Sequence, residues 1–318
     1  MVQWGYKLSS EEHGPRDLVR CARRAEQIGF DFAAISDHYH PWTDRQGHSP
    51  FVWSVLGAIA QVTDRIVLGT GVTCPTIRTH PAIVAHAAAT TASLLPGRFF
   101  LGVGTGENLN EHILGDRWPR VAVRRRMLEE AIGVIRSLWD GGSKSHEGSH
   151  YRLENARVYD LPDPLPPIYV AAGGEKAIEL AGRAGDGLIA LAPDKEMLEA
   201  FDEAGGRGKP RLAEVTVCWA NDQDTATRMA MEWWPNVALP GELGQELPLP
   251  RHFEQAAESV TPKDVAEKMA LGPDPERHLE LARKYIDAGY THVWFHQVGP
   301  DQEGFFDFYE SQVLPKLR

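Results

Sequence analysis

Residues 98–104 read R-F-F-L-G-V-G, and this stretch decides the fold. It is short and apolar throughout, which is typical of a parallel strand that is buried on both faces. A helical stretch precedes it, from about Pro81 to Leu94, and a second helical pattern follows it through M-L-E-E-A-I-G-V-I-R-S-L-W (127–139). The local unit is therefore a buried strand between two helices.

The same unit recurs along the chain. Seven further stretches have this strand character, and they are residues 3–8, 31–37, 65–72, 166–172, 186–192, 212–220 and 291–296. Helical patterns separate most of them; the first opens at Pro15 and ends at Gly29, and others cover about 50–63 and 175–184. Eight such units in 318 residues fit a (β/α)8 TIM barrel better than an open doubly wound sheet. We therefore predict one barrel domain over residues 1–318.

A glycine-rich stretch does not favour the competing Rossmann fold. G-V-G-T-G-E (102–107) departs from the G-x-G-x-x-G pattern, and it lies deep in the chain rather than after the first strand. Two segments interrupt the barrel pattern. Residues 141–165 predict a small hairpin, and residues 221–275, rich in proline and glycine, predict a helical insertion. We expect these insertions to cap the carboxyl-terminal face of the barrel.

Composition narrows the classes of function. The formal net charge of −11 argues against a nucleic-acid or anionic-membrane partner, because both require clustered positive charge. The basic run Arg124-Arg125-Arg126 continues into an amphipathic helical pattern and predicts a solvated helix face. The sequence starts without a signal-peptide pattern and holds no apolar run near the length of a membrane span. Its three cysteines are scattered, which does not support a disulfide framework. We expect a soluble, cytoplasmic protein that binds a small molecule.

A barrel places its active site at the carboxyl ends of its strands. The second strand ends in S-D-H-Y-H-P-W (36–42), where His38 and His40 have the spacing of metal ligands. A catalytic metal needs at least a third protein ligand, and the other strand ends are poor in ligands, so we predict no metal site. No G-x-S-x-G elbow is present, and Cys74 before a proline suggests packing rather than nucleophilic catalysis. The imidazole, carboxylate and indole that remain suit proton transfers around a hydride step on a flat cofactor.

Four motifs carry a resemblance to a known family. They are S-D-H-Y-H-P-W (36–42), T-G-V-T-C-P-T (70–76), F-F-L-G-V-G-T-G-E-N-L-N (99–110) and V-A-A-G-G (170–174). Together they resemble the deazaflavin-dependent branch of the luciferase-like superfamily, and above all the glucose-6-phosphate dehydrogenases that use coenzyme F420. The resemblance covers nearly the whole chain. It implies coenzyme F420 as the cofactor, oxidation of a C–OH group, and a homodimer.

The resemblance also implies a role for individual residues. His38 would take the proton of the substrate hydroxyl, Glu107 would handle a proton at the far side of the deazaflavin, Trp42 would stack near the reacting centre, and Glu11 would be a further polar contact. The cofactor would be lined by Asp37, Gly71, Val72, Cys74, Thr105, Gly106, Asn110, Gly173, Gly174, Lys176 and Ala177. A cis peptide bond that is not followed by proline would fall at Gly71-Val72. His40, in contrast, is expected to be structural.

The chain departs from the family pattern where the substrate is expected to bind. Leu191 and Asp194 stand where sugar-phosphate enzymes have a threonine and a lysine, Lys195 is one step out of register, and Gln255 aligns with a second lysine. Because a phosphate dianion needs charge-assisted donors, a less charged sugar or a secondary alcohol is as good a candidate as a hexose phosphate. Two alternatives stay open: an FMN-dependent luciferase-like monooxygenase, and a non-catalytic relative that only binds the cofactor.

Overall fold

The computed structural model describes residues 2–318, and its centre is a closed barrel of parallel strands. Within those residues the hydrogen-bonded order is β1-β2-β3-β4-β7-β8-β9-β11, and β11 pairs with β1 to close the barrel. The strands are Gln3–Leu8 (β1), Phe32–Ile35 (β2), Val67–Thr70 (β3), Phe99–Val103 (β4), Ile168–Ala171 (β7), Gly187–Ala190 (β8), Arg211–Cys218 (β9) and His292–Gln297 (β11). The predicted TIM barrel is confirmed.

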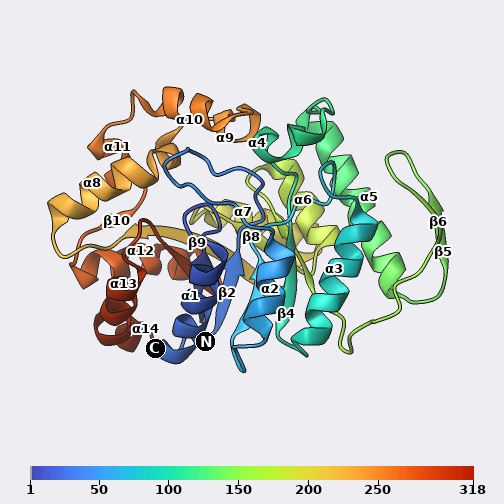
Figure 1. The fold of residues 1–318 in the computed structure, drawn as a ribbon, viewed down its shortest axis with the longest axis horizontal. Helices are drawn as coiled ribbons and strands as arrows, with labels where there is room; N and C mark the ends of the chain where they lie inside the picture. The colour runs from blue at the N-terminus through green and yellow to red at the C-terminus, as the bar shows by residue number, and fades with distance from the viewer. Residues whose placement is uncertain (1) are drawn as a thin grey trace.

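Helices surround this barrel (Figure 1). They are Pro15–Ile28 (α1), Val52–Ala60 (α2), Pro81–Leu94 (α3), Val121–Trp139 (α5), Glu175–Ala184 (α6), Lys195–Phe201 (α7), Pro275–Ala288 (α12) and Gln302–Phe308 (α13). The end of α1 illustrates the local rules. Gly29 adopts φ 96°, and its amide bonds back to the carbonyls of Ala25 and Glu26, a conformation that glycine adopts without a steric penalty. Only α2 is clearly shorter than its predicted range.

Aromatic side chains fill the barrel, and glycines on adjacent strands make room for them. Phe32, Phe100 and Trp294 belong to one buried cluster inside the barrel. A Cβ atom at Gly5 would overlap the ring of Phe32, and one at Gly69 would overlap the ring of Phe100. The glycines in these strands are therefore packing positions, since each leaves the volume that a neighbouring ring occupies.

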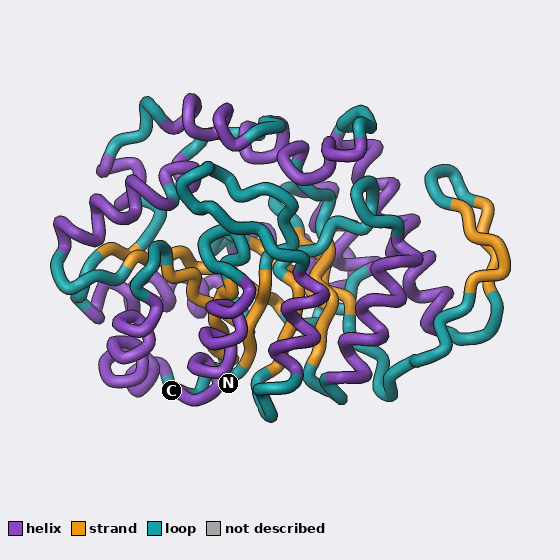
Figure 2. Tube along the Cα trace, viewed as in Figure 1, coloured by secondary structure: helices purple, strands orange, loops and turns teal. Residues whose placement is uncertain are grey.

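The first insertion forms the predicted hairpin, although it does not cover the barrel mouth. Its strands are Lys144–Glu147 (β5) and Arg152–Ala156 (β6), and they pair antiparallel. The hairpin follows a helix rather than a strand, so it starts from the amino-terminal side and stands beside α5 (Figure 2). Its one described link to the catalytic side is Tyr151, whose hydroxyl donates to the carbonyl of Thr76 at 3.0 Å.

The second insertion covers the carboxyl-terminal end of the barrel, as predicted (Figure 1). It consists of Gln223–Trp233 (α8), Leu243–Glu246 (α9), Pro250–Ala257 (α10), Pro262–Ala266 (α11) and a two-residue strand, Ala270–Leu271 (β10), that pairs with β9. The short helix Asn108–Glu111 (α4), after β4, contacts α9. Short turns complete the chain at residues 112–114, 202–206, 235–238 and 309–313, before Leu314–Leu317 (α14).

The glycine packing can be tested with a matched pair of substitutions. A Cβ atom at Gly102 would overlap the backbone carbonyl of Thr70 on the neighbouring strand, which cannot move without breaking the sheet. We expect Gly102→Ala to lower the free energy of unfolding by about 1–3 kcal/mol or more. At Gly133, inside α5, such a Cβ would meet no atom of residues 2–318 within 4 Å apart from the neighbouring backbone of the helix itself, so Gly133→Ala should raise the free energy of unfolding by about 0.5–1 kcal/mol. Urea unfolding followed by circular dichroism measures both; equal effects would contradict the packing argument.

Candidate active site

The loops after β1 and β2 bring Glu11 and His38 together. The Nε2 atom of His38 lies 3.4 Å from Oε1 of Glu11, and its Nδ1 atom lies 3.2 Å from the backbone carbonyl of His40. A carbonyl oxygen can only accept, so in the neutral ring the hydrogen belongs on Nδ1. The lone pair of Nε2 is then on the side of Glu11, where a proton taken up by the ring would meet a carboxylate.

Glu11 is held as a carboxylate although it is only 2% exposed. Its Oε2 atom accepts hydrogen bonds from the hydroxyls of Ser36 and Ser9. Burial alone would raise the pKa of Glu11, but the facing His38 ring, the Lys7 ammonium and the Ser36 hydroxyl hold this pKa at about 2. Glu11 therefore remains charged at neutral pH, next to the imidazole.

Trp42 connects this pair to the second insertion. Its ring centroid lies 5.0 Å from that of His38 and 5.2 Å from that of Phe253 on α10, which is fully buried. The side chain of Gln46 accepts a hydrogen bond from the Trp42 amide at 2.8 Å and donates to the carbonyl of Trp233 at 2.9 Å. Phe253 was not predicted as a site residue, because no local pattern in an insertion says which loop it will cover.

Asp37 belongs to a buried ion-pair network. Its carboxylate accepts from the hydroxyl of Thr73 at 2.8 Å and pairs with Arg78 at 3.0 Å. The Arg78 guanidinium also donates to the Asp37 carbonyl and lies 3.4 Å from Glu111, whose carboxylate accepts the Arg78 amide at 2.7 Å. Burial keeps the pKa of Glu111 raised, although Arg78 opposes that shift. Arg78 was not predicted from the sequence, since its two partners come from separate loops.

The loop after β4 fixes the loop after β2. Asn110, which is buried, accepts hydrogen bonds from the amides of Tyr39 at 2.8 Å and His40 at 3.1 Å. Its own amide nitrogen lies 3.4 Å from the carboxylate of Glu107. The Nδ1 atom of His40 lies 2.9 Å from the carbonyl of Leu109, which matches the structural role expected for His40. Within residues 2–318 the Glu107 side chain does not cap α4, so its carboxylate stays available for other chemistry.

The predicted cis peptide bond at Gly71-Val72 is present. The Gly71 carbonyl accepts a hydrogen bond from Nζ of Lys7 at 3.0 Å. Gly106 adopts φ 73° and packs against Cys74, because a Cβ atom at Gly106 would overlap the Cys74 sulfur. The neighbouring Thr105 is half-buried. The Sγ atom of Cys74 lies 3.0 Å from the hydroxyl of Thr76, and burial raises the pKa of the thiol well above its usual value. Cys74 is therefore a packing residue rather than a nucleophile.

The glycine pair after β7 leaves the amino terminus of α6 open. A Cβ atom at Gly173 or Gly174 would meet no atom of residues 2–318 within 4 Å. Gly174 is the N-cap of this ten-residue helix, so the first amides of α6 point toward open space. Lys176 is exposed and pairs with Glu179 at 2.7 Å, and Ala177 is half-buried. Free amides at a helix start are suited to an anionic group such as a phosphate.

The residues predicted to bind substrate lie on the rim and are exposed. Leu191 follows β8 and is 70% exposed, and its carbonyl accepts a hydrogen bond from the Tyr285 hydroxyl at 2.8 Å. Asp194 caps α7, because its carboxylate accepts the Met197 amide at 3.1 Å, and Lys195 begins that helix. Gln255 is exposed on α10, two positions after Phe253, so the two side chains leave the helix on different faces. Their contacts with substrate stay a prediction.

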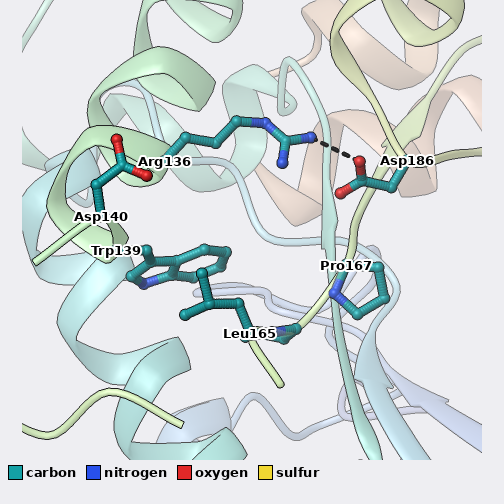
Figure 3. A pocket seen from close by; sticks show the side chains of 7 residues that line it. Arg136, Trp139, Asp140, Leu165, Pro167 and Asp186 are labelled. Carbon is teal, nitrogen blue, oxygen red and sulfur yellow. Dashed lines mark hydrogen bonds and ion pairs between the residues drawn. The ribbon is translucent and has the colours of Figure 1, made fainter. Parts of the chain in front are cut away.

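A hollow of about 350 Å³ lies at the opposite end of the barrel (Figure 3). It is lined by Arg136, Trp139, Asp140, Leu165, Pro166, Pro167 and Asp186. Pro167 and Asp186 immediately precede β7 and β8, so the hollow is at the amino ends of the strands, away from His38. The Arg136 guanidinium reaches Asp186 there at 2.9 Å. Active sites of this fold lie at the other end, and the hollow is not part of the candidate site.

Residues 2–318 hold no group of three or more His, Cys, Asp or Glu side chains arranged to bind a metal ion. In the same range, every helix is too short or too polar to cross a membrane.

A family description matches most of the chain: that of the luciferase-like monooxygenases covers residues 2–292. The chain belongs to this family. Full-length luciferase-like relatives include F420-dependent glucose-6-phosphate dehydrogenases from Microbacterium testaceum, 38% identical over 100% of this chain and 98% of the relative, and from Mycobacterium tuberculosis, 37% identical with the same coverage. The resemblance predicted from the four motifs is confirmed.

Solved structures of luciferase-like proteins agree with this assignment. An F420-dependent secondary alcohol dehydrogenase, in complex with an F420-acetone adduct, superposes with a TM-score of 0.93 at 29% identity and covers 100% of this chain and 99% of its own. A Baeyer-Villiger monooxygenase in complex with FMN, from Pseudomonas putida, reaches a TM-score of 0.72 at 18% identity, covering 99% of this chain and 98% of its own. The second likeness shows the fold alone.

The ion-pair network around Asp37 predicts a large effect of removing Arg78. Arg78→Met leaves two buried carboxylates without their cation, and we expect the free energy of unfolding to fall by about 3–5 kcal/mol. Arg136→Met is the matched control, because its pair with Asp186 is about two-fifths exposed and should contribute at most about 1 kcal/mol.

The same pair of variants has a predicted pH dependence. The pKa of Glu111 is already raised, and without Arg78 it rises further, so the folded variant keeps a proton on Glu111 at low pH and loses stability as pH increases. The loss in the free energy of unfolding caused by Arg78→Met should therefore be smaller at pH 5 than at pH 8. Urea unfolding at both pH values measures this loss, and equal losses in Arg78→Met and Arg136→Met would contradict the network.

Proposed function

We propose that this chain is an F420-dependent dehydrogenase that oxidises the C–OH group of a secondary alcohol, sugar or sugar phosphate. The observation that carries the proposal is the His38–Glu11 pair beside Trp42 at the carboxyl end of the barrel. Relatives that span the whole chain are named F420-dependent dehydrogenases, one of glucose-6-phosphate and one of secondary alcohols, which supports both the cofactor and the reaction class.

The residues present fit the cofactor. The open glycine pair at the start of α6 offers free amides to its anionic phosphodiester group, and no side chain of residues 2–318 fills the space above Gly173 and Gly174. Gly71 and Val72 follow β3, with Val72 packed against the aromatic cluster of the barrel interior. In the proposal these two residues lie behind the ring, while Asp37, Cys74, Thr105, Gly106 and Asn110 shape the walls. When bound, F420 supplies the acceptor for the hydride.

In the proposed reaction His38 removes the proton of the substrate hydroxyl. Its Nδ1–H donates to the His40 carbonyl, which orients the ring and leaves the Nε2 lone pair for the hydroxyl proton. The ring becomes positively charged when it takes this proton. The Glu11 carboxylate, whose pKa is held at about 2, lies 3.4 Å from Nε2 and stabilises that charge. Oxidation of the C–OH carbon thus proceeds from an alcohol that is losing its proton.

Glu107 is the proposed second proton carrier. It follows β4, a neighbour of β3 in the barrel, and its carboxylate is half-buried and bonded only weakly to Asn110. Trp42 and Phe253 cover the reacting region from the side of the second insertion, and their rings exclude water from it.

The charges around the site favour a substrate without a phosphate. The two described cations near it are already paired, Lys7 with Glu214 and Arg78 with Asp37 and Glu111. Glu11 adds negative charge beside the proposed base, and Asp194 contributes a carboxylate at the rim. A phosphate dianion there would be repelled unless it reached an exposed cation such as Lys195.

Cofactor binding is the first test. We expect purified protein to quench the fluorescence of oxidised F420 on titration and to bind FMN at least about tenfold more weakly. Hydride transfer should then appear as loss of F420 absorbance with a panel of secondary alcohols and sugars, each compared with a phosphorylated counterpart where one exists. From the charges, kcat/KM should be higher for the unphosphorylated member. Tight FMN binding without any response to F420 would contradict the proposal and favour the monooxygenase alternative.

The role of His38 predicts a separation of binding from turnover. His38→Ala should lower kcat by about 10²–10⁴-fold, the range expected for a lost general base, while the F420 dissociation constant changes little. His86→Ala is the control, because His86 is exposed on α3 and outside the site. If His38→Ala kept full turnover, His38 would not be the base.

A further inference from the structure

A charged side chain lies in the barrel interior directly below the site. Lys7, on β1, has a side chain that is only 8% exposed. Its Nζ atom donates to Oε2 of Glu214 on β9 at 2.8 Å and to the carbonyl of Gly71 at 3.0 Å. The indole of Trp294 on β11 donates to the same Glu214 oxygen at 2.8 Å. Lys7, on β1, therefore bonds to β9 and to the residue that follows β3, and β11 joins the group through Glu214.

Several charged groups face Lys7, and they come from different elements. Glu214 lies on β9, Glu11 in the loop after β1 and Glu107 in the loop after β4; all three raise the pKa of the Lys7 ammonium, against the lowering effect of burial. His296 on β11 lies 3.8 Å from Glu214 and 2.8 Å from Glu12. The net effect raises the pKa of Lys7, so its ammonium stays charged beside Glu214.

Stability alone does not account for this lysine. Most of the side chains around it in the barrel interior are aromatic or aliphatic, and a buried ion pair contributes no more stability than a well-packed hydrophobic pair of the same volume, and often less. Beyond Glu214, the groups around Lys7 all belong to the proposed site. They are the Gly71 carbonyl, behind the proposed position of the deazaflavin ring, Glu11, the partner of His38, and Glu107, the proposed second proton carrier.

We propose that Lys7 is a positioning residue for hydride transfer, which holds the Gly71 carbonyl in place and acts on His38 through the charge it presents to Glu11. The proposal rests on the proposed function, and it assigns Lys7 no contact with substrate. Without Lys7, Glu11 loses one of the charges that lower its pKa, so the carboxylate takes up a proton at a higher pH than in the native protein. Protonated Glu11 no longer stabilises a charged His38.

Four variants separate this role from simple stability. Lys7→Met removes the cation but leaves Glu214 buried and unpaired, which risks misfolding. The double variant Lys7→Met/Glu214→Gln removes both charges and so avoids that unpaired carboxylate. Glu214→Gln alone keeps the Lys7 cation and breaks only the ion pair. Arg98→Met is the matched control at the other end of the barrel, where Arg98 donates to the carbonyls of Ile66 and Thr63.

The first readout is the pH profile of turnover with F420 and the best alcohol of the panel. For the double variant we expect kcat to fall by about tenfold or more with KM changed by less than about threefold, because the lost interaction acts on the reacting geometry. The acid limb of its kcat profile should move to higher pH, because loss of the Lys7 cation makes proton uptake by the site easier. Glu214→Gln and Arg98→Met should lower stability but leave the acid limb where it is. A double variant with the native profile would overturn the proposal.

The second readout needs no cofactor. In the native protein the lowered pKa of Glu11 contributes stability that is present above the unfolded value, near 4.5, and is lost as pH falls toward about 2. Urea unfolding of cofactor-free protein between pH 7 and pH 3 should therefore show a smaller acid loss in the double variant than in Glu214→Gln, which has the same change at position 214. Parallel curves would overturn the link from Lys7 to Glu11. This comparison remains decisive even if the protein does not bind F420, which would contradict only the proposed function.

Discussion

The parallel pairing of β1 with β2 is the constraint on which the site depends. Leu8 on β1 pairs with Ile35 on β2. Glu11 lies three residues after Leu8, and His38 lies three residues after Ile35. Parallel strands in register end at the same edge, and equal loop lengths beyond that edge bring the carboxylate and the imidazole to the same height. The same pairing places Ser36 within reach of both Ser10 and Glu11, so backbone register and side-chain hydrogen bonds reinforce one another. A slip of one residue would separate His38, the proposed base, from Glu11.

Loops from distant parts of the chain then hold this pair in one geometry. Asn110 binds the amides of residues 39 and 40, and the second insertion presents Phe253 to Trp42. Both contacts act on the segment that carries His38. A catalytic ring on a loop is precise only when neighbouring elements fix that loop, and here the barrel supplies the neighbours.

Buried charge is the cost of this arrangement. Lys7, Glu11, Asp37, Arg78, Glu111 and Glu214 are all largely shielded from water, and each is stabilised only by the partners around it. Such networks contribute little net stability, because desolvation offsets most of the attraction. They concentrate at the carboxyl end of the barrel, above a cluster of aromatic and aliphatic side chains, and this is the end where the proposed chemistry takes place.

The barrel, its strands and helices, the second insertion over the mouth and the family motifs could all be predicted from the sequence, because they depend on local periodicity and on short contiguous patterns. It also indicated His38, Glu11 and the cis bond at Gly71-Val72 through the family resemblance. The side chains that those residues contact depend on the folded barrel and could not be predicted from the sequence. Lys7 and Glu214 are 207 positions apart, Trp42 meets Phe253 across the barrel mouth, and Arg78 joins two loops. The hairpin of residues 144–156 lies beside α5 for the same reason, since its place depends on which end of the barrel the preceding helix reaches. Contacts of this kind arise from closure of the barrel, and no local pattern of residues encodes them.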